Sequence, residues 1–438
     1  MSGTIEELAA KRKRWVEANR ENGFEAGLKR LLTELYPDSA HFIYELLQNA
    51  EDAHAQEVRF ILYEDHIEFE HNGERLFSIK DVDAITSIGF STKRDDVTNI
   101  GKFGVGFKAV LAYTETPEIE SGEFHFRIRD MVVPEPNGLA RSYSEDKKTR
   151  FILPFDNSKK SPQQARSEIE ELLRYLGATT LLFLTHIRKI EYLLPDSTIG
   201  YIERVERREN RFEIRVQHPN ELAPSSTWFL LFDKLVQVED EEAENESNKV
   251  KSCRIAVAFG LVPVDAKATA KEKKDCNAEA PAEWELAPME PGRVCIYFPA
   301  DKETANLRFH LHAPFASTVA RDSVRDCSGN NLLRDHLADL LAESMSTIRN
   351  QGLLNVRALA LLPNDKDNLP TFYQPLMKRI VEEFKEKNLV PMKRGGHAAA
   401  DGVFRGSKAL SDLIDDDDMV TLLGDDYVVI VDKVRKSL

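Results

Sequence analysis

The chain has few cysteines, no long apolar run and no visible secretory signal. Each of these absences excludes a class of protein. Its few cysteines lack the spacing of a metal site or a redox pair: Cys253, Cys276, Cys295 and Cys327. We therefore expect free thiols in a reducing compartment. There is no run of about eighteen apolar residues, so no membrane span is expected. The first residues lack a basic flank followed by an apolar stretch, so the sequence predicts a cytoplasmic protein.

Positive charge is also in deficit. Lys and Arg number 59 against 74 Asp and Glu, a formal net charge of −15 at pH 7. This balance weighs against nucleic acid as the main partner. Two basic clusters, Lys11–Arg14 and Arg204–Arg211, are interleaved with or flanked by acidic residues, so we expect each on a solvated helix face. The acidic run Asp415–Asp418 is read in the same way, as solvated charge.

The length of 438 residues, with 42% hydrophobic and 30% charged residues, predicts a globular chain of two or three domains. The predicted linker is Asn157–Pro162, and two polar stretches are expected to be surface loops, Glu239–Lys249 and Ala266–Ala282. The domains that we predict are an N-terminal domain, a middle domain with loop insertions and a small C-terminal α/β region: residues 1–156, 157–352 and 353–438.

Hydrophobic periodicity predicts the elements of the first domain. The expected helices are residues 4–35, 40–54 and 78–88. The expected strands are 57–63 and 66–70, which form a hairpin, and then 123–133 and 150–155. A mixed sheet covered on one face by helices follows, so the fold class is α+β.

Further along, the same patterns predict an alternation of strands and helices. The expected strands are residues 180–184, 212–216, 228–232, 254–262, 294–299, 307–313 and 427–431. The expected helices are residues 163–176, 330–350 and 370–387.

The helix over 40–54 carries a polar stripe. Glu45 and Asn49 are four residues apart and Asp52 is three further on, so the three lie along one side of a helix. An asparagine carbonyl is a hard ligand suited to Mg²⁺. A carboxylate one turn away can accept a proton from an attacking water. A surface helix whose polar residues face water explains this segment alone equally well.

A glycine-rich loop follows at residues 99–107. Gly101, Gly104 and Gly106 have the spacing G-x-x-G-x-G and lead into an apolar helical segment. Such glycines allow the backbone to approach a phosphate, and the helix start offers N–H groups. The loop has no Gly-Lys-Ser/Thr ending and follows a polar loop, so it is neither a P-loop nor a dinucleotide fingerprint.

Three blocks in this order resemble the GHKL ATPases, the superfamily of gyrase, the ninety-kilodalton heat-shock chaperone, sensor histidine kinases and MutL. They are residues 41–53, 70–77 and 99–111. Residues 35–53 look most like the sacsin and NO VEIN branch. The resemblance implies a Bergerat-type ATP-binding sandwich, followed by a transducer-like α/β domain, with ATP and Mg²⁺ as cofactors.

The resemblance also implies site residues. Glu45 corresponds to the general base and Asn49 to the magnesium ligand, with Asp52 and Ala53 at the nucleotide edge of the helix. Gly73 corresponds to the turn beneath adenine and Thr149 to a strand threonine that bonds it. The remaining nucleotide contacts fall in the lid and the glycine box: Ser91, Thr92, Lys93, Gly101, Lys102, Phe103, Gly104, Val105, Gly106 and Phe107.

One position departs from the family pattern. The second block begins with His71-Asn72-Gly73, where the family has an aspartate that accepts a hydrogen bond from the adenine amino group. A neutral imidazole nitrogen or the Asn72 carbonyl can accept instead. A histidine that only closes a turn is the alternative. In the second domain, residues 309–322 resemble sacsin-like proteins, which makes Arg321 and Arg325 candidates for the cation at the γ-phosphate. Surface pairing with Asp322 or Asp326 is the alternative.

By this resemblance the chain is a Mg²⁺-dependent ATPase that hydrolyses slowly and drives conformational change, chaperone-like or regulatory, within a larger or defence-related protein. The alternative is a nucleotide-gated binding or scaffold module with little or no hydrolysis. Glu45 favours the first reading, and His71 leaves room for the second. The expected partners are a protein client or partner domain and an ATP-dependent second copy. A histidine kinase is disfavoured because residues 1–40 contain no histidine.

Overall fold

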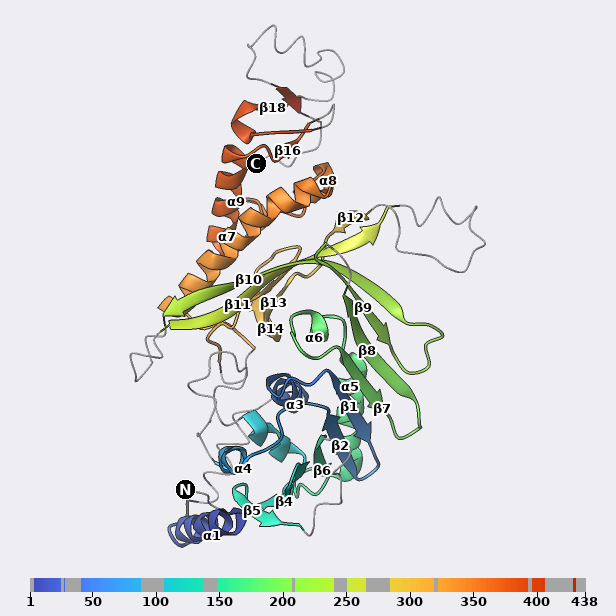
Figure 1. The fold of residues 1–438 in the computed structure, drawn as a ribbon, viewed down its shortest axis with the longest axis vertical. Helices are drawn as coiled ribbons and strands as arrows, with labels where there is room; N and C mark the ends of the chain where they lie inside the picture. Colours follow the sequence, from blue (N-terminus) through green and yellow to red (C-terminus); the bar gives the residue numbers. More distant parts are fainter. Residues whose placement is uncertain are drawn as a thin grey trace.

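The computed structural model describes residues 4–24, 27, 41–87, 106–137, 148–206, 209–239, 250–264, 284–318, 322–392, 396–405 and 428–430. Over these residues the chain is α+β, with a large mixed sheet and helices packed against it (Figure 1). None of the helices in these ranges has the length and apolar character needed to cross a membrane.

The N-terminal part combines helices on one side with short strands. Its helical elements are α1 (Ile5–Glu21), α3 (His41–Asp52), α4 (Ile79–Ile85), the 3₁₀ helix η1 (Gly106–Ala112), α5 (Pro162–Tyr175) and α6 (Thr179–Leu182). Its strands are β1 (Glu57–Leu62), β2 (His66–His71), β3 (Glu118–Ser121), β4 (Phe124–Arg129), β5 (Val133–Pro136) and β6 (Thr149–Pro154). The predicted hairpin over 57–70 is confirmed, because β1 and β2 pair antiparallel.

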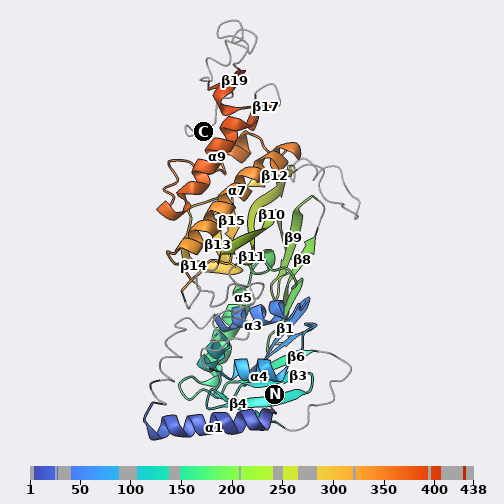
Figure 2. The same cartoon turned by 60° about the vertical axis from the view of Figure 1, so that its left-hand side comes forward.

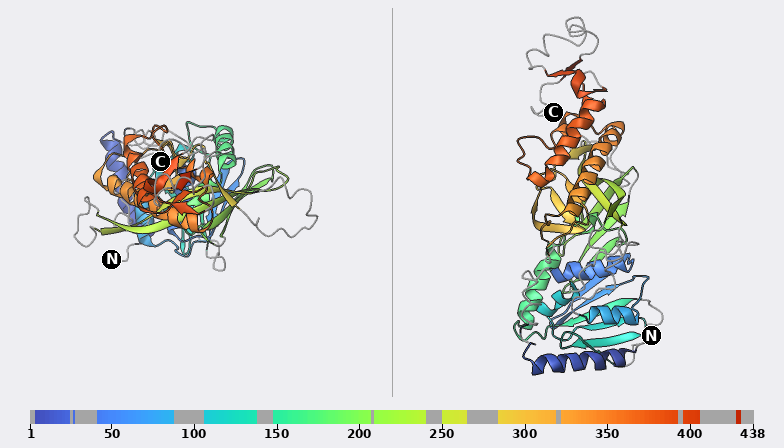
Figure 3. Two further views of the ribbon diagram at one scale, coloured as in Figure 1. Left: turned by 90° about the horizontal axis from the view of Figure 1, so that it is seen from above. Right: turned by 90° about the vertical axis from the view of Figure 1, so that its left-hand side faces the viewer.

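These strands belong to one hydrogen-bonded sheet that continues into the middle of the chain. β1 pairs antiparallel with β2 and parallel with β7 (Lys189–Leu193), and the order runs on through β6, β3, β4 and β5. The predicted domain boundary after residue 156 therefore lies where the sheet is continuous in space. α1 lies along β5 at the far edge, as Figures 2 and 3 show.

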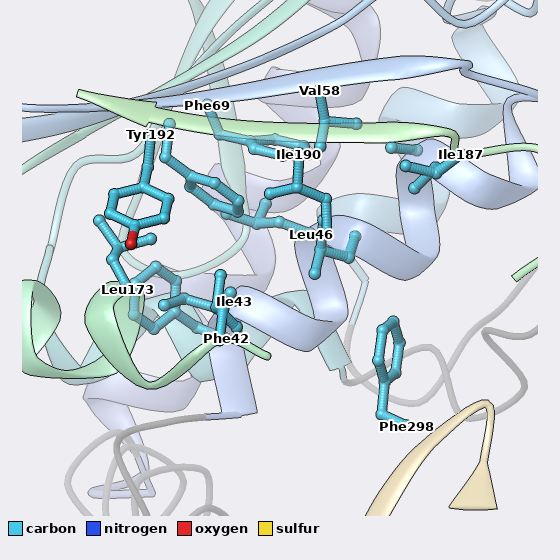
Figure 4. Packing of buried hydrophobic residues seen from close by; sticks show 14 of the residues in the cluster. Phe42, Ile43, Leu46, Val58, Phe69, Leu173, Ile187, Ile190, Tyr192 and Phe298 are labelled. Carbon is cyan, nitrogen blue, oxygen red and sulfur yellow. The ribbon is translucent and has the colours of Figure 1, made fainter. Parts of the chain in front are cut away.

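Helix α3 is held by an apolar face. Phe42, Ile43 and Leu46 are almost fully buried and share one core with Phe69 of β2 and Ile190 of β7 (Figure 4). Burying side chains of this size contributes about 1.5–3 kcal/mol each. The core therefore fixes which side of α3 faces the sheet, and its polar stripe is fixed with it.

The middle and C-terminal parts extend the sheet and cover it with long helices. The further strands are β8 (Ile199–Glu206), β9 (Arg211–Gln217), β10 (Ser225–Glu239), β11 (Val250–Pro263), β12 (Trp284–Ala287), β13 (Arg293–Ile296), β14 (Phe298–Thr304) and β15 (His310–His312). Helices α7 (Ser328–Asn350), α8 (Val356–Leu359) and α9 (Gln374–Glu386) follow, with the 3₁₀ helix η4 (Thr371–Tyr373) before α9. The last elements are β16 (Val390–Pro391), β17 (His397–Ala398), the 3₁₀ helix η5 (Ala400–Gly402), β18 (Val403–Arg405) and β19 (Val428–Ile430). α7 and α9 share a second core with the long β10–β11 hairpin.

The turn between β13 and β14 reaches back to α3. Phe298 is 5% exposed, and its ring centroid lies 4.7 Å from that of Tyr44 on α3. Figure 4 shows Phe298 pointing from this turn toward the helix that carries Leu46. Tyr297 precedes it with a φ of 68°, a left-handed conformation that turns the chain sharply. The turn therefore joins the two cores through side-chain packing.

Several sequence predictions are wrong. The helix expected over 4–35 ends at Glu21, just before Gly23 with a φ of 72°. The strand expected over 294–299 is divided between β13 and β14 by the turn at Tyr297.

Residues 180–184 were expected to be a strand, but Thr179–Leu182 is the short helix α6; a short apolar run does not separate the two. Residues 123–133 form two strands, β4 and β5, separated by a turn at Asp130 and Met131 with positive φ. Arg204–Arg211, read as a solvated helix face, falls in β8 and β9, with Arg204 only 7% exposed.

Candidate functional site

The polar stripe predicted for α3 is present. Glu45 and Asp52 are 8% and 6% exposed, while Asn49 between them is half-buried. Leu46 and Ala50, on other sides of the same turns, are fully buried in the core. The three polar residues therefore lie at the edge of the core, neither fully solvated nor inside it, as a binding surface on a rigid helix requires.

The glycine box meets this stripe at Glu45. A Cβ placed on Gly106 would lie 1.9 Å from Glu45 Oε2 and 2.5 Å from Cδ. A side chain on this residue of η1 would force the Glu45 carboxylate to move away from the position it holds here. The glycine is thus required for a close approach, and the start of η1 and the predicted general base are adjacent.

The second block meets the other end of α3. A Cβ on Gly73 would lie 2.7 Å from Ala53 Cβ and 2.9 Å from His71 Nδ1. The backbone N–H of Gly73 donates to His71 Nδ1 at 3.2 Å. The neutral ring then carries its proton on Nε2, which makes that atom a donor. The turn-closing reading of His71 agrees with this bond.

Asn72 closes the neighbouring turn. Its side chain is exposed, and its Oδ1 accepts the backbone N–H groups of Gln56 and Glu57, both at 2.9 Å. Two donors use the lone pairs of a carbonyl oxygen. The two acceptors that the sequence offered for an adenine amino group, His71 Nδ1 and Asn72 Oδ1, are therefore both used by backbone donors.

Thr149 lies in β6 directly opposite His71 and is fully buried. Its Oγ1 lies 2.6 Å from Ser121 Oγ, which in turn accepts the backbone N–H of Phe77 at 3.0 Å. The sequence did not single out Ser121. Its signal is a serine at the end of a short strand, too common a feature to identify alone.

A buried lysine fixes the base of η1 and was also missed. Lys108 is 3% exposed, and its Nζ donates to the carbonyls of Ile85 (2.9 Å) and Met131 (2.6 Å). Burial, with a smaller contribution from Arg12, lowers the pKa of Lys108 to about 7. Arg12 of α1 also donates to Ser87 Oγ at 2.6 Å. Ile85 and Ser87, just before the predicted lid, are therefore held by η1 and α1.

Glu51 binds α3 to the turn between α6 and β7. Its carboxylate accepts four hydrogen bonds, from Thr185 N (2.6 Å), Thr185 Oγ1 (2.6 Å), His186 N (2.9 Å) and Ile187 N (2.9 Å). Arg204 holds the same turn from its carbonyl side, donating to Leu184 O and, at 3.3 Å, to Leu181 O. Burial lowers the pKa of Arg204 to about 10. The carboxylate and guanidinium thus lock the turn between α6 and β7 onto α3.

The remaining predicted residues divide in three. Phe107 lies in η1, 9% exposed, with its ring centroid 5.7 Å from that of Phe151, so its side chain packs in the core. Arg325 is exposed, and its backbone N–H donates to Ala316 O at 2.9 Å. Its role at a phosphate stays a prediction. The others lie outside the described residues: Ser91, Thr92, Lys93, Gly101, Lys102, Phe103, Gly104, Val105 and Arg321. Among the described residues, the structure brings together Glu45 with Gly106, Ala53 with Gly73 and His71, and His71 with Thr149.

The comparison with known proteins bears on this same region. The chain is 28% identical to Protein NO VEIN of Arabidopsis thaliana over 348 residues, which are 73% of this chain and 12% of that protein. It is 35% identical to Sacsin of Homo sapiens over 128 residues, which are 25% of this chain and 3% of that protein. The chain thus spans a small part of either relative. Residues 23–170, which include every predicted site residue except the two arginines, match the family model of the Sacsin domain, so the predicted similarity to the sacsin and NO VEIN branch is confirmed.

Proposed function

We propose that this chain is an ATP-binding module of the GHKL type that hydrolyses ATP slowly with Mg²⁺ and couples the nucleotide to conformational change. The observation that carries the proposal is the pair of close approaches at the two ends of α3. Gly106 lies against Glu45 at one end, and Gly73 lies against Ala53 and His71 at the other. Glycines at these positions let both neighbouring segments approach the two ends of the helix closely.

The residues present fit a magnesium-bound triphosphate. Asn49 supplies a hard oxygen ligand, and Mg²⁺ when bound neutralises phosphate charge. Glu45, largely buried beside η1, accepts the proton of an attacking water. The start of η1 at Gly106 faces this carboxylate. Glu45, Asn49 and Gly106, the last glycine of the box, therefore lie on or beside one end of α3.

We call the end of α3 beside Gly73 and His71 the base end. A hydrogen-bond donor there suits a nucleobase. The bond from Gly73 to His71 Nδ1 leaves Nε2 protonated in the neutral ring. We propose that this ring, in place of the usual aspartate, contacts the base. Thr149 and Ser121, buried beside His71, form the floor of this end.

Conformational coupling is supported by the turn at Tyr297 and Phe298, which packs on α3 next to Glu45. A change at the polar stripe therefore reaches the second core by direct contact. We propose that the client is a protein or a partner domain, since the net charge of −15 disfavours nucleic acid. Association of two copies on ATP is part of the same proposal.

The test is Mg²⁺-dependent ATP binding and turnover by the purified chain, with Glu45→Gln and Asn49→Ala. Turnover lost by at least about 10²-fold in Glu45→Gln with binding retained supports the proposal. Asn49→Ala should lose the Mg²⁺ dependence of binding. Glu64→Gln is the control, because Glu64 is a largely exposed glutamate of the β1–β2 turn. Binding without turnover in the unsubstituted chain favours the nucleotide-gated scaffold, and absence of binding contradicts both.

A further inference from the structure

The face of the N-terminal sheet that points away from α3 carries charged side chains at alternate positions. Strands β2, β3, β4 and β6 contribute one or two of these residues each (β3, β4 and β6 are labelled in Figure 2). They are Glu68, Glu70, Glu118, Glu120, His125, Arg127 and Arg150. Alternation places them on the face opposite Ser121 and Thr149 of the same strands. This face is therefore separate from the proposed nucleotide site.

Three of these residues converge. One ligand atom from each of Glu118, Glu120 and His125 lies within 4.8 Å of the others. His125 Nε2 is 2.6 Å from Glu118 Oε1 and 3.4 Å from Glu120 Oε1. Their side chains are only 10–12% exposed. The group is thus a nearly buried set of one nitrogen and two oxygen ligands rather than a solvated acidic patch.

The surroundings of Glu120 independently indicate that a ligand binds here. The residue is 9% exposed, and its Oε2 is buried without a hydrogen-bond partner. The nearest cation is Arg150 Nη1 at 3.8 Å, beyond hydrogen-bonding distance, because Arg150 donates instead to Glu70 at 2.7 Å. A buried carboxylate oxygen without a partner calls for a ligand, a water or an ion.

The net charge around these residues also favours a bound cation. Among the described residues, Arg127 and Arg150 are the guanidiniums paired with the four carboxylates Glu68, Glu70, Glu118 and Glu120, and His66 lies 3.6 Å from Glu68. With both histidines neutral, four carboxylates minus two guanidiniums leave two negative charges in excess. Arg59, the next cation along the sheet, is paired with Glu191. The excess equals the charge of one divalent cation.

We propose that Glu118, Glu120 and His125 bind a divalent transition-metal cation of the zinc class, a site distinct from the proposed nucleotide site. One imidazole and two carboxylates suit Zn²⁺ and its neighbours better than Mg²⁺ or Ca²⁺, which prefer oxygen alone. Ligand atoms about 2.0–2.2 Å from a tetrahedral Zn²⁺ lie about 3.3 Å from one another. The 3.4 Å separation of Glu120 Oε1 from His125 Nε2 already has this value.

The short contact of His125 with Glu118 is where the metal enters. At 2.6 Å the neutral His125 ring donates its Nε2 proton to Glu118 Oε1. A metal at Nε2 takes the place of this proton, which moves to Nδ1 of the same ring, and the contact lengthens. Glu118 Oε2 is already oriented by Arg127 at 3.1 Å, which leaves Oε1 for the metal.

The role that follows is structural. Glu118 and Glu120 come from β3 and His125 from β4, so the metal ties the two strands of the hairpin at the cross-strand pair Glu120–His125. Ser121, the next residue after Glu120, contacts Thr149 on the other face. The metal therefore stabilises the hairpin that carries the floor of the base end, without touching a nucleotide.

The test uses the full chain, stripped with a chelator and titrated with Zn²⁺ by calorimetry and with Co²⁺ by visible absorption, without nucleotide. We expect one saturable site per chain, a tetrahedral Co²⁺ spectrum without a thiolate band, and a raised melting temperature. Glu120→Gln and His125→Gln should each weaken affinity at least tenfold, with an unchanged circular dichroism spectrum. His66→Gln is the matched control, a histidine beside Asp65 and Glu68 outside the cluster, and should bind normally.

Two outcomes overturn the site. One is the absence of stoichiometric binding, which would mean that the arginines alone balance the carboxylates. The other is equal affinity in His125→Gln and the unsubstituted chain, which would place the metal elsewhere, for example at Cys253, Cys295 or Cys327. Asn49→Ala separates this proposal from the nucleotide site, because it should leave Zn²⁺ affinity unchanged.

Discussion

The carboxylate of Glu45 occupies the space that a side chain at Gly106 would take, since a Cβ there would lie 1.9 Å from Glu45 Oε2. The two residues are 61 positions apart in the sequence. Their contact joins α3 to η1 at the point where we propose that hydrolysis occurs. The glycine is therefore needed for the position of the carboxylate as well as for the path of the backbone.

Gly106→Ala should displace that carboxylate. The clashing atoms are at the end of a side chain, which can rotate, so we expect a loss of stability of about 1–3 kcal/mol, as for other overpacking changes. The displaced group no longer reaches the water, and turnover should fall by about 10²-fold. Steady-state kinetics with chemical denaturation measure both. Gly177→Ala is the control, since its added Cβ would have its nearest neighbour at 4.0 Å. Equal turnover in the two variants would contradict the base assignment.

Glu51→Gln should destabilise the fold without touching the site. Its carboxylate accepts four hydrogen bonds, and an amide replaces one acceptor oxygen by a donor that faces backbone N–H groups. We expect a loss of about 2–4 kcal/mol in the free energy of unfolding, measured with urea. Glu64→Gln, at an exposed ion pair, should change it by less than about 0.5 kcal/mol. A loss equally small in Glu51→Gln would show that the turn does not depend on this residue.

The sequence predicted the parts of the site that local pattern encodes. The stripe of α3 follows from helical periodicity, and the glycines follow from their spacing. It did not predict Glu51, because the backbone groups that bind it lie 134 to 136 residues away. Arg204 was misread because strand alternation, unknown before the sheet register, turns it inward.

Other features near the site were also not predictable from the sequence. β3 was not predicted because four residues after Pro117 give too short a pattern, and its pairing with β6 is a long-range property. The hydrogen bond that fixes the His71 ring depends on the local turn conformation, which residue type alone does not give. The charged face of β3 and β4 likewise appears in the sequence only as scattered glutamates and a histidine.

Phe298→Ala should weaken the contact between the two cores. Phe298 packs on Tyr44 at 4.7 Å and is 5% exposed, so truncation should cost about 3–5 kcal/mol. If the turn couples the cores, thermal unfolding should change from one transition to two. Calorimetry measures this, and a Tyr44→Ala double-mutant cycle should give a coupling of about 0.5–1.5 kcal/mol. Tyr175→Ala, at a side chain 73% exposed, is the control and should leave a single transition.

Two buried histidines of β15 lie at the join between the cores. His312 accepts the backbone N–H of Tyr297 at 3.2 Å, and its ring stacks on Phe183 at 5.2 Å. His310 accepts the backbone N–H of Arg293 at 2.9 Å. The Nε2 of each ring is buried without a hydrogen-bond partner. Burial, reinforced by a nearby arginine in each case, lowers the pKa of His312 to about 3 and that of His310 to about 4.

Acid should therefore destabilise the fold through these rings. The unfolded chain binds a proton on each histidine near pH 6.5, whereas the folded chain does not until about pH 3–4, so the unfolded state holds more protons in between. Stability then falls with pH below 6.5, by about 1.4 kcal/mol per unit for each ring. His312→Gln should remove one such contribution. Urea unfolding at pH 6.0, 5.5 and 5.0 (about the upper part of this window) measures the slope, and an unchanged slope would mean that His312 titrates normally in the folded chain.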